Sequence, residues 1–175
     1  LIMKPKVSII IPNYNEKENL ERGVLEEVST FLKKANFSWE VIINDDGSTD
    51  GSLESLSNFV KKQKGFILLK GKHGGKASGL WSGIKKAKGE IVLFTDMDQS
   101  TPLKEIEKLL PWYNKGFNVV FGSRGRLRKN FPLIRQLTSW GFRVIRQTFL
   151  LKNVADTQCG FKSLKKEIAL EIFPK

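Results

Sequence analysis

The chain has 175 residues, of which 40% are hydrophobic and 27% charged, so it can bury a domain core and is not a disordered tail. Lys and Arg number 30 against 18 Asp and Glu, and the resulting net charge of +12 favours an anionic partner: a nucleic acid, a phosphorylated small molecule or an anionic membrane. One cysteine, Cys159, excludes an internal disulfide framework, and one histidine, His73, excludes a multi-histidine metal site.

Strand and helix patterns alternate along the first two thirds of the chain. Short β-branched or apolar runs predict strands at 7–11, 39–43, 66–69, 91–95 and 119–122. Apolar residues at helical spacing predict helices at 20–32, at 53–60, around 80–88 and after Pro102. This order predicts an α/β fold with a mostly parallel sheet and helices on both faces. Ligands of such sheets bind beyond the carboxyl ends of the strands, where the polar segments 13–16, 45–48 and 96–98 fall.

The charges are divided along the chain. No Asp or Glu occurs between Lys108 and Ala155, while 13 of the 18 acids lie in the first hundred residues. No apolar run approaches the roughly 18 residues that span a bilayer, and no secretory signal is visible. We therefore expect a reducing, cytoplasmic setting.

The glycine-rich segment 71–77 (GKHGGKA) does not meet the P-loop pattern. Three residues separate Gly71 from Gly75 where four are needed, and Ala77 stands where a magnesium-binding Ser or Thr belongs. A dinucleotide-binding G-x-G-x-x-G after the first strand is also missing. The sequence therefore favours neither an ATPase nor a nicotinamide-dependent enzyme.

An Asp-x-Asp pair follows the fourth predicted strand. Asp96 and Asp98 flank Met97, and two carboxylates in one loop can bind a hard divalent ion together with its phosphate ligand. Mg²⁺ or Mn²⁺ fits such a pair. A solvated turn would produce the same short pattern, so the pair alone is weak evidence.

A second acidic motif, DDGSTD at 45–50, follows the second predicted strand. Ser48 or Asp50 could cap the next helix, since both residue types are good N-caps. A turn with a cap does not explain why two acids, Asp45 and Asp46, stand together at the carboxyl end of a strand.

Five segments in one order carry a family resemblance: VSIIIPNYNE, DDGSTD, KHGGKASGLWSGIKKAKGE, TDMDQSTP and FGSR. In this order and spacing they resemble the family 2 glycosyltransferases, which have a GT-A (Rossmann-like) fold, over nearly the whole chain. The later DTQCGFK at 156–162 is similar to the branch that transfers a hexose from a nucleotide to a polyprenyl phosphate. Within that branch it looks closer to dolichyl-phosphate glucosyltransferases than to the mannosyltransferases.

The resemblance implies a site for a nucleotide sugar. In the family, the first loop and the DDGS acids hold the nucleoside, and the matching residues here are Pro12, Tyr14, Glu16, Asp45 and Asp46. A carboxylate can accept a hydrogen bond from a pyrimidine or guanine N–H.

The resemblance also implies a metal and a diphosphate partner. Asp96 and Asp98 match the motif that binds Mg²⁺ or Mn²⁺, and Asp96 also belongs to the nucleotide-sugar site. Lys76 of the glycine-rich turn is the expected partner of the diphosphate. Some relatives have a Gln two residues after the second Asp, where this chain has Ser100. The Gln of this chain, Gln99, stands one residue earlier, so the identity of a third metal ligand stays open.

Two further departures and the single cysteine have plain interpretations. His73 replaces the family's Asn and is interpreted as a hydrogen-bonding loop residue rather than a base. Ala77 replaces a glycine. Cys159 is interpreted as a buried motif residue rather than a nucleophile.

The basic part of the chain matches the acceptor side of the family. Arg124 corresponds to an arginine near the phosphates, while Arg135, Ser139 and Lys162 correspond to residues that contact the lipid phosphate. The segment around 133–146 predicts a basic amphipathic helix in the C-terminal third. Periodicity allows either a membrane-interface helix or a core-packed helix with a solvated Arg face, and the resemblance favours the interface.

The expected activity is an inverting transfer of a hexose, with glucose from UDP-glucose favoured, to a dolichyl-type polyprenyl phosphate. Asp98 and Arg124 are the expected catalytic residues, and the anionic acceptor needs no strong base. Three alternatives stay open: a GDP-mannose-dependent mannosyltransferase, a family 2 transferase with a polysaccharide acceptor, and a non-catalytic fragment that binds nucleotide sugar. A nucleic-acid binder is not favoured, because no DNA- or RNA-binding motif is present.

We expect a single GT-A domain over residues 1–175, truncated at its C-terminus. Residues 1–122 would bind the nucleotide sugar, and residues 123–175 would face the acceptor and an anionic membrane surface. The expected location is the cytoplasmic face of a membrane, with peripheral attachment. Oligomeric state, and dolichol versus undecaprenol, stay open.

Overall fold

The computed structural model describes residues 5–122 and 159–173. The chain divides into two compact units: Leu1–Phe121 with Gly160–Lys175, and Gly122–Cys159. The first unit contains every strand and helix described below. The predicted amphipathic helix and the residues Arg124, Arg135 and Ser139 lie outside the described residues.

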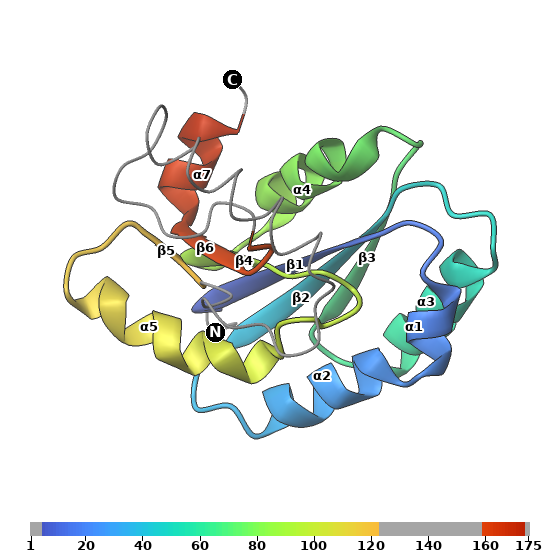
Figure 1. Ribbon diagram of the computed structural model, residues 1–175, viewed down its shortest axis with the longest axis horizontal. Coiled ribbons are helices and arrows are strands. Elements are labelled where there is room, and N and C mark those ends of the chain that lie inside the picture. The colour runs from blue at the N-terminus through green and yellow to red at the C-terminus, as the bar shows by residue number, and fades with distance from the viewer. Residues whose placement is uncertain (1–4, 123–158, 174–175) are drawn as a thin grey trace, which may run out of the picture. The chain divides into compact units, whose positions relative to one another are not determined.

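Strands and helices of the first unit alternate in the predicted order (Figure 1). The strands are β1 (Val7–Asn13), β2 (Trp39–Asp45), β3 (Phe66–Lys70), β4 (Ile91–Phe94), β5 (Val119–Phe121) and β6 (Lys162–Lys165). The helices are α1 (Lys17–Glu21), α2 (Val24–Lys33), α3 (Ser52–Lys62), α4 (Gly75–Lys86), the 3₁₀ turn η1 (Leu103–Glu105), α5 (Ile106–Asn114) and α7 (Lys166–Ile172). In the part of the chain that the structure describes, no helix has the length and apolar character required to cross a membrane.

The strands form one six-stranded sheet in the order β3-β2-β1-β4-β6-β5. β1, β2, β3 and β4 pair in parallel, whereas β6 pairs antiparallel with both β4 and β5. Helices α4 and α7 lie on one face of the sheet, and α2, α3 and α5 lie on the other (Figure 1). The predicted α/β architecture with a mostly parallel sheet is confirmed.

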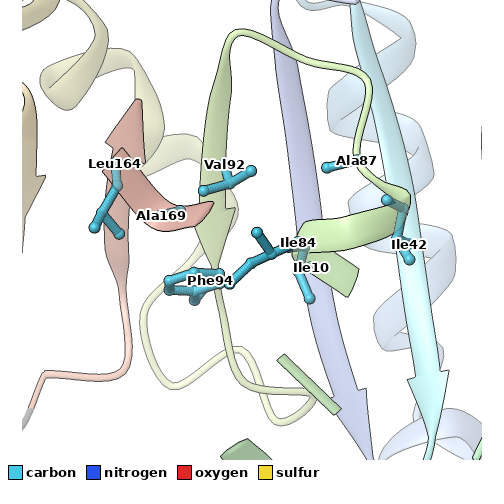
Figure 2. Close-up of a cluster of buried hydrophobic side chains, with 8 residues drawn as sticks. All are labelled: Ile10, Ile42, Ile84, Ala87, Val92, Phe94, Leu164 and Ala169. Atoms are coloured by element: carbon cyan, nitrogen blue, oxygen red, sulfur yellow. The ribbon is translucent and has the colours of Figure 1, made fainter. Parts of the chain in front are cut away.

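The core forms because the central strands are apolar on both faces. Ile10, Ile42 and Val92 pack with Ile84 of α4 and Ala169 of α7 on one face (Figure 2). Side chains alternate along a strand, so the neighbouring Ile9, Ile43 and Leu93, which are also fully buried, point to the opposite face. Burial on both faces is the usual environment of parallel strands, and it explains their continuous β-branched runs.

Two parts of the fold differ from the sequence expectation. The helix expected over 20–32 is interrupted, because Gly23 adopts a left-handed backbone with φ of 84° between α1 and α2. β6 was not predicted at all. Its sequence, KSLK, is short and largely polar, and it becomes a strand because it pairs with β4 on one side and β5 on the other.

Tyr113 links α5 to β6 and provides a test of this packing. Its hydroxyl donates to Ser163 Oγ at 2.8 Å, and Ser163 Oγ donates to the carbonyl of Val120 at 2.8 Å. Burial raises the pKa of Tyr113 to about 12, although the hydrogen bonds oppose this shift. A raised folded-state pKa means that the unfolded chain ionises first, near pH 10. The neutral Tyr113 hydroxyl therefore adds its full contribution to the free energy of unfolding below pH 10. This contribution is lost as the pH rises towards 12.

We expect Tyr113→Phe to remove this pH dependence. The free energy of unfolding of both proteins is measured by urea unfolding at several values between pH 9 and pH 12. Lysine residues also titrate in this range, but they affect both proteins alike and cancel in the difference. The difference in unfolding free energy between wild type and Tyr113→Phe should fall steadily above pH 10. A difference that stays constant across this range would contradict the assignment.

Candidate functional site

The carboxyl ends of the parallel strands meet at one edge of the sheet. The register pairs Asn13 with Asp45 and Asp45 with Lys70, so β1, β2 and β3 end side by side. β4 ends at Phe94, paired with Ile10, and β1 continues beyond it. Four loops therefore lie along this edge: 13–16, 45–51, 71–74 and 95–102. They contain all the acidic motifs that the sequence singled out.

Asp45 holds the first two loops together. Its side chain is 1% exposed and accepts hydrogen bonds from Asn13 Nδ2 at 2.7 Å and Ser48 Oγ at 2.6 Å. The other carboxylate oxygen accepts from the backbone N–H groups of Gly47 and Ser48 at 3.2 and 3.1 Å. Four donors are as many as a carboxylate usually accepts. Asp45 thus shapes the loop from within, and its contact with a nucleobase stays a prediction.

The remaining polar residues of the second loop start the next helix. Asp50 accepts from the backbone N–H and the hydroxyl of Ser52, the first residue of α3, and from the backbone N–H of Lys17. Partial burial alone would raise the pKa of Asp50, but these hydrogen bonds outweigh it and lower the pKa below its ordinary value. The capping function expected of DDGSTD is thus carried by Asp50, one residue before the N-cap position Gly51.

Asp46 fixes the glycine-rich turn and the start of α4. Its buried carboxylate accepts the backbone N–H groups of Gly74 at 2.9 Å and Gly75 at 2.8 Å, and it lies 3.3 Å from His73 Nδ1. An acid at a helix N-terminus also interacts favourably with the helix dipole. This contact explains why α4 begins at Gly75, several residues before the apolar pattern near Leu80 that predicted it.

An aromatic pair lies between the first and third loops. The Tyr14 ring, 46% exposed, stacks on His73 with centroids 4.4 Å apart and planes tilted by 37°. Pro12 lies half-buried on β1, and the backbone N–H of Glu16 donates to Ser52 Oγ at 3.0 Å. The Tyr14 ring contacts His73 and is exposed enough to stack against a flat ring as well.

Lys76 and Asp96 join the glycine-rich turn to the Asp-x-Asp loop. Lys76 Nζ forms a short ion pair with Asp96 Oδ1, and the side chains are 60% and 35% exposed. The other oxygen of Asp96 lies against Gly160, where an added Cβ would overlap Oδ2. With a side chain at position 160, the carboxylate would have to move from its present position. Gly160, far along the chain, thus supports the Asp-x-Asp loop.

Asp98 lies on the exposed side of the same loop. Its Oδ1 accepts the backbone N–H of Ser100 at 2.9 Å, and Arg22 donates to its carbonyl oxygen at 3.0 Å. Gln99 adopts a left-handed backbone with φ of 49° and donates to Thr95 Oγ1 and to the carbonyl of Asp96. Its own Oε1 is buried, with no hydrogen-bond donor in the described residues.

This donor set fits a hard divalent cation. Within residues 5–122 and 159–173, no three His, Cys, Asp or Glu side chains gather into a complete metal cage. Two carboxylates in one loop are nevertheless the usual protein contribution to Mg²⁺, which completes its octahedron with water and substrate phosphates. The unpartnered Gln99 Oε1 is a further oxygen on the same loop.

The described site brings most of the nucleotide-side residues to one edge, and Lys162 lies on β6 beside Phe94, the last residue of β4, at that same edge. Lys162 opens β6, half-buried, opposite Phe94 and Phe121. Cys159 is buried with a free thiol, as its interpretation as a motif residue expected.

The sequence analysis did not single out Arg22 and Gly160. Gly160 lies in the DTQCGFK motif, but the sequence does not show that this glycine lies against Asp96. Nothing in the sequence around Arg22 distinguishes it from other surface arginines.

The arrangement described above can be compared with known proteins. The family model of Glycosyl transferase family 2 matches residues 8–173, and the chain belongs to this family. The dolichyl-phosphate beta-glucosyltransferase of Dictyostelium discoideum is 33% identical over 96% of the chain. The dolichol-phosphate mannosyltransferase of Pyrococcus furiosus is 32% identical over 93% of the chain.

A similar solved structure is a mannosyltransferase from Pyrobaculum calidifontis in complex with GDP-Man and Mn²⁺. It superposes with a TM-score of 0.68 at 20% identity, over 98% of this chain and 47% of that one. This similarity supports the GT-A fold. The chain spans about half the length of the relatives it matches, 56% of the Dictyostelium protein and 47% of the Pyrococcus protein.

Proposed function

We propose that this chain is the catalytic part of an inverting glycosyltransferase that moves glucose from UDP-glucose to a dolichyl-type polyprenyl phosphate. The observation that carries the proposal is the meeting of Lys76, from the glycine-rich turn, with Asp96 of the Asp-x-Asp loop at one sheet edge. A cationic donor beside a pair of carboxylates suits a diphosphate that arrives with a divalent ion. The similarity to dolichyl-phosphate beta-glucosyltransferases supports the sugar and the acceptor.

The donor would lie across the loops of this edge. Tyr14 offers an exposed ring to the base, while Asp45 and Asp46 hold the loops on either side of it in place. Pro12 and Glu16 belong to the same nucleoside-binding loop. Lys76 is close enough to the Asp-x-Asp loop to bind the diphosphate there.

Asp96 and Asp98 would hold Mg²⁺ or Mn²⁺, which supplies charge neutralisation for the leaving diphosphate when bound. Lys76 and Arg124 would add donors directed at the same developing charge. Arg135, Ser139 and Lys162 would grip the acceptor phosphate. The acceptor oxygen is already anionic at neutral pH, so the chain needs no strong base. Attack opposite the leaving group would invert the anomeric carbon and give a β-linked product from an α-linked donor.

We further propose that residues 1–122 bind the donor and that residues 123–175 face the acceptor at an anionic membrane surface. The absence of Asp and Glu between Lys108 and Ala155 supports attraction of this segment to anionic lipid. The cytoplasmic face is the expected location, because nucleotide sugars and a chain without a disulfide framework both suit it. Sedimentation with vesicles that contain or lack phosphatidylserine measures the attraction, which should weaken as salt is raised.

A titration of donors tests the proposal most directly. UDP-glucose and GDP-mannose are titrated calorimetrically into the protein with Mn²⁺ and then with EDTA. We expect UDP-glucose to bind with Mn²⁺ and to lose most of its affinity in EDTA, followed by transfer of labelled glucose to polyprenyl phosphate. Binding of GDP-mannose alone would establish the alternative that the Pyrococcus relative supports. Donor binding without transfer would indicate a binding fragment, and binding of neither would overturn the proposal.

A further inference from the structure

The ion pair between Lys76 and Asp96 has a consequence for how the proposed site is filled. Asp96 Oδ1 is in contact with Lys76 Nζ, and Asp96 Oδ2 lies against the backbone at Gly160. A lysine ammonium therefore contacts one oxygen of Asp96, and the other oxygen lies close to Gly160. A divalent cation that binds Asp96 through Oδ1 would therefore compete with Lys76 for that oxygen.

The backbone at Lys76 is fixed by the contacts at the start of α4. It is the second residue of α4, directly after the two glycines whose N–H groups Asp46 accepts. Asp46 is buried and its loop is in turn held by the backbone bond from Asp46 N–H to the carbonyl of Asn13. The root of the Lys76 side chain is therefore fixed, while its exposed end is able to move.

The chemistry of the two cations differs in a way that permits exchange. Lysine carries a compact charge on a flexible four-carbon stem, and a partly exposed pair of this kind is weak. A divalent ion brings twice the charge and repels the ammonium. A diphosphate arriving with the ion offers Lys76 a new anionic partner within the reach of the same stem.

We infer that Lys76 is an exchangeable counter-ion for Asp96: it occupies Asp96 Oδ1 before the donor binds, competes there with the divalent cation, and transfers to the diphosphate once the donor is bound. This inference rests on the proposed donor and metal site. By this inference Lys76 weakens the binding of the free cation and strengthens the binding of the diphosphate. A purely structural ion pair, or a lysine that only binds phosphate, would not combine these effects.

The test compares wild type with Lys76→Met, which keeps the length of the side chain and removes its charge. Lys86→Met is the matched control, because Lys86 is exposed at the other end of α4 and gives the same change of net charge. Binding of Mn²⁺ alone is measured by the loss of the free-ion electron paramagnetic resonance signal. Binding of UDP is measured calorimetrically at saturating Mn²⁺.

We expect Lys76→Met to bind Mn²⁺ alone about two- to fivefold more tightly than wild type, in keeping with a partly exposed pair. UDP should bind the same variant about tenfold more weakly, because a charge-assisted contact is lost. Lys86→Met should show only the small gain in Mn²⁺ affinity that one fewer positive charge at a distance produces.

Equal or weaker binding of Mn²⁺ to Lys76→Met, relative to the Lys86→Met control, would overturn the exchange. The outcomes also separate this inference from the proposed function. A Lys76→Met variant that binds UDP but still no Mn²⁺ would sink the exchange and leave a nucleotide site. A wild type that binds neither UDP nor Mn²⁺ would overturn both this inference and the proposed function.

Discussion

Asp98→Asn is expected to lower sugar transfer by about 10²- to 10³-fold, because loss of a metal-binding carboxylate removes several kcal/mol of charge stabilisation from the reaction. The fold should survive the change. Asp98 is exposed, and the asparagine oxygen can still accept the backbone N–H of Ser100 that Asp98 Oδ1 accepts now.

The measurement is the initial rate of labelled glucose transfer to polyprenyl phosphate over a range of Mn²⁺ concentrations. Thermal unfolding without metal serves as the control and should give the same midpoint for both proteins. Excess Mn²⁺ should restore part of the rate if the remaining ligand, Asp96, still holds the ion weakly. A variant with wild-type activity would show that Asp98 is a solvated turn residue and not a metal ligand.

Gly160→Ala is expected to lower transfer by about 10²-fold even though the substitution adds a single methyl group. The new Cβ would overlap Oδ2 of Asp96 and force that carboxylate to turn away. A displacement of about 1 Å in a reacting site is enough for a loss of this size. Stability should fall little, because the overlapping atom ends a side chain that can rotate.

A double-mutant cycle with Asp96→Ala tests whether Gly160 acts through Asp96. Shortening the side chain of Asp96 removes the oxygen that the new methyl group would meet, so Gly160→Ala should change the melting temperature less in the Asp96→Ala background than in wild type. Binding of Mn²⁺ should be weakened by either single change and lowered no further by the second. Additive effects on both readouts would mean that Gly160 is required for the local backbone and not for Asp96.

Sequence patterns predicted the strands of the central sheet well because their signal is local. A buried parallel strand must be apolar on both faces, and Val7–Ile11 or Ile91–Phe94 can satisfy this only with continuous β-branched or aromatic runs. The ends were less accurate. β1 and β2 continue to Asn13 and Asp45, since these polar residues still pair with each other.

The start of α4 and the existence of β6 were beyond such patterns. Glycines at 74 and 75 have low helix propensity, and the helix starts there because Asp46, distant in sequence, accepts their N–H groups. The segment KSLK has no strand pattern of its own, and it forms β6 because it pairs with β4 on one side and β5 on the other.

By itself, the sequence determined the α/β class, the family and the placing of the acidic motifs after buried strands, because each follows from runs of adjacent residues. Tertiary structure alone decided that Lys76 pairs with Asp96, that Asp46 anchors α4 and that Gly160 makes room for the Asp96 carboxylate. These contacts join residues far apart in the chain, and a pairing of that kind depends on strand order and register rather than on any local pattern.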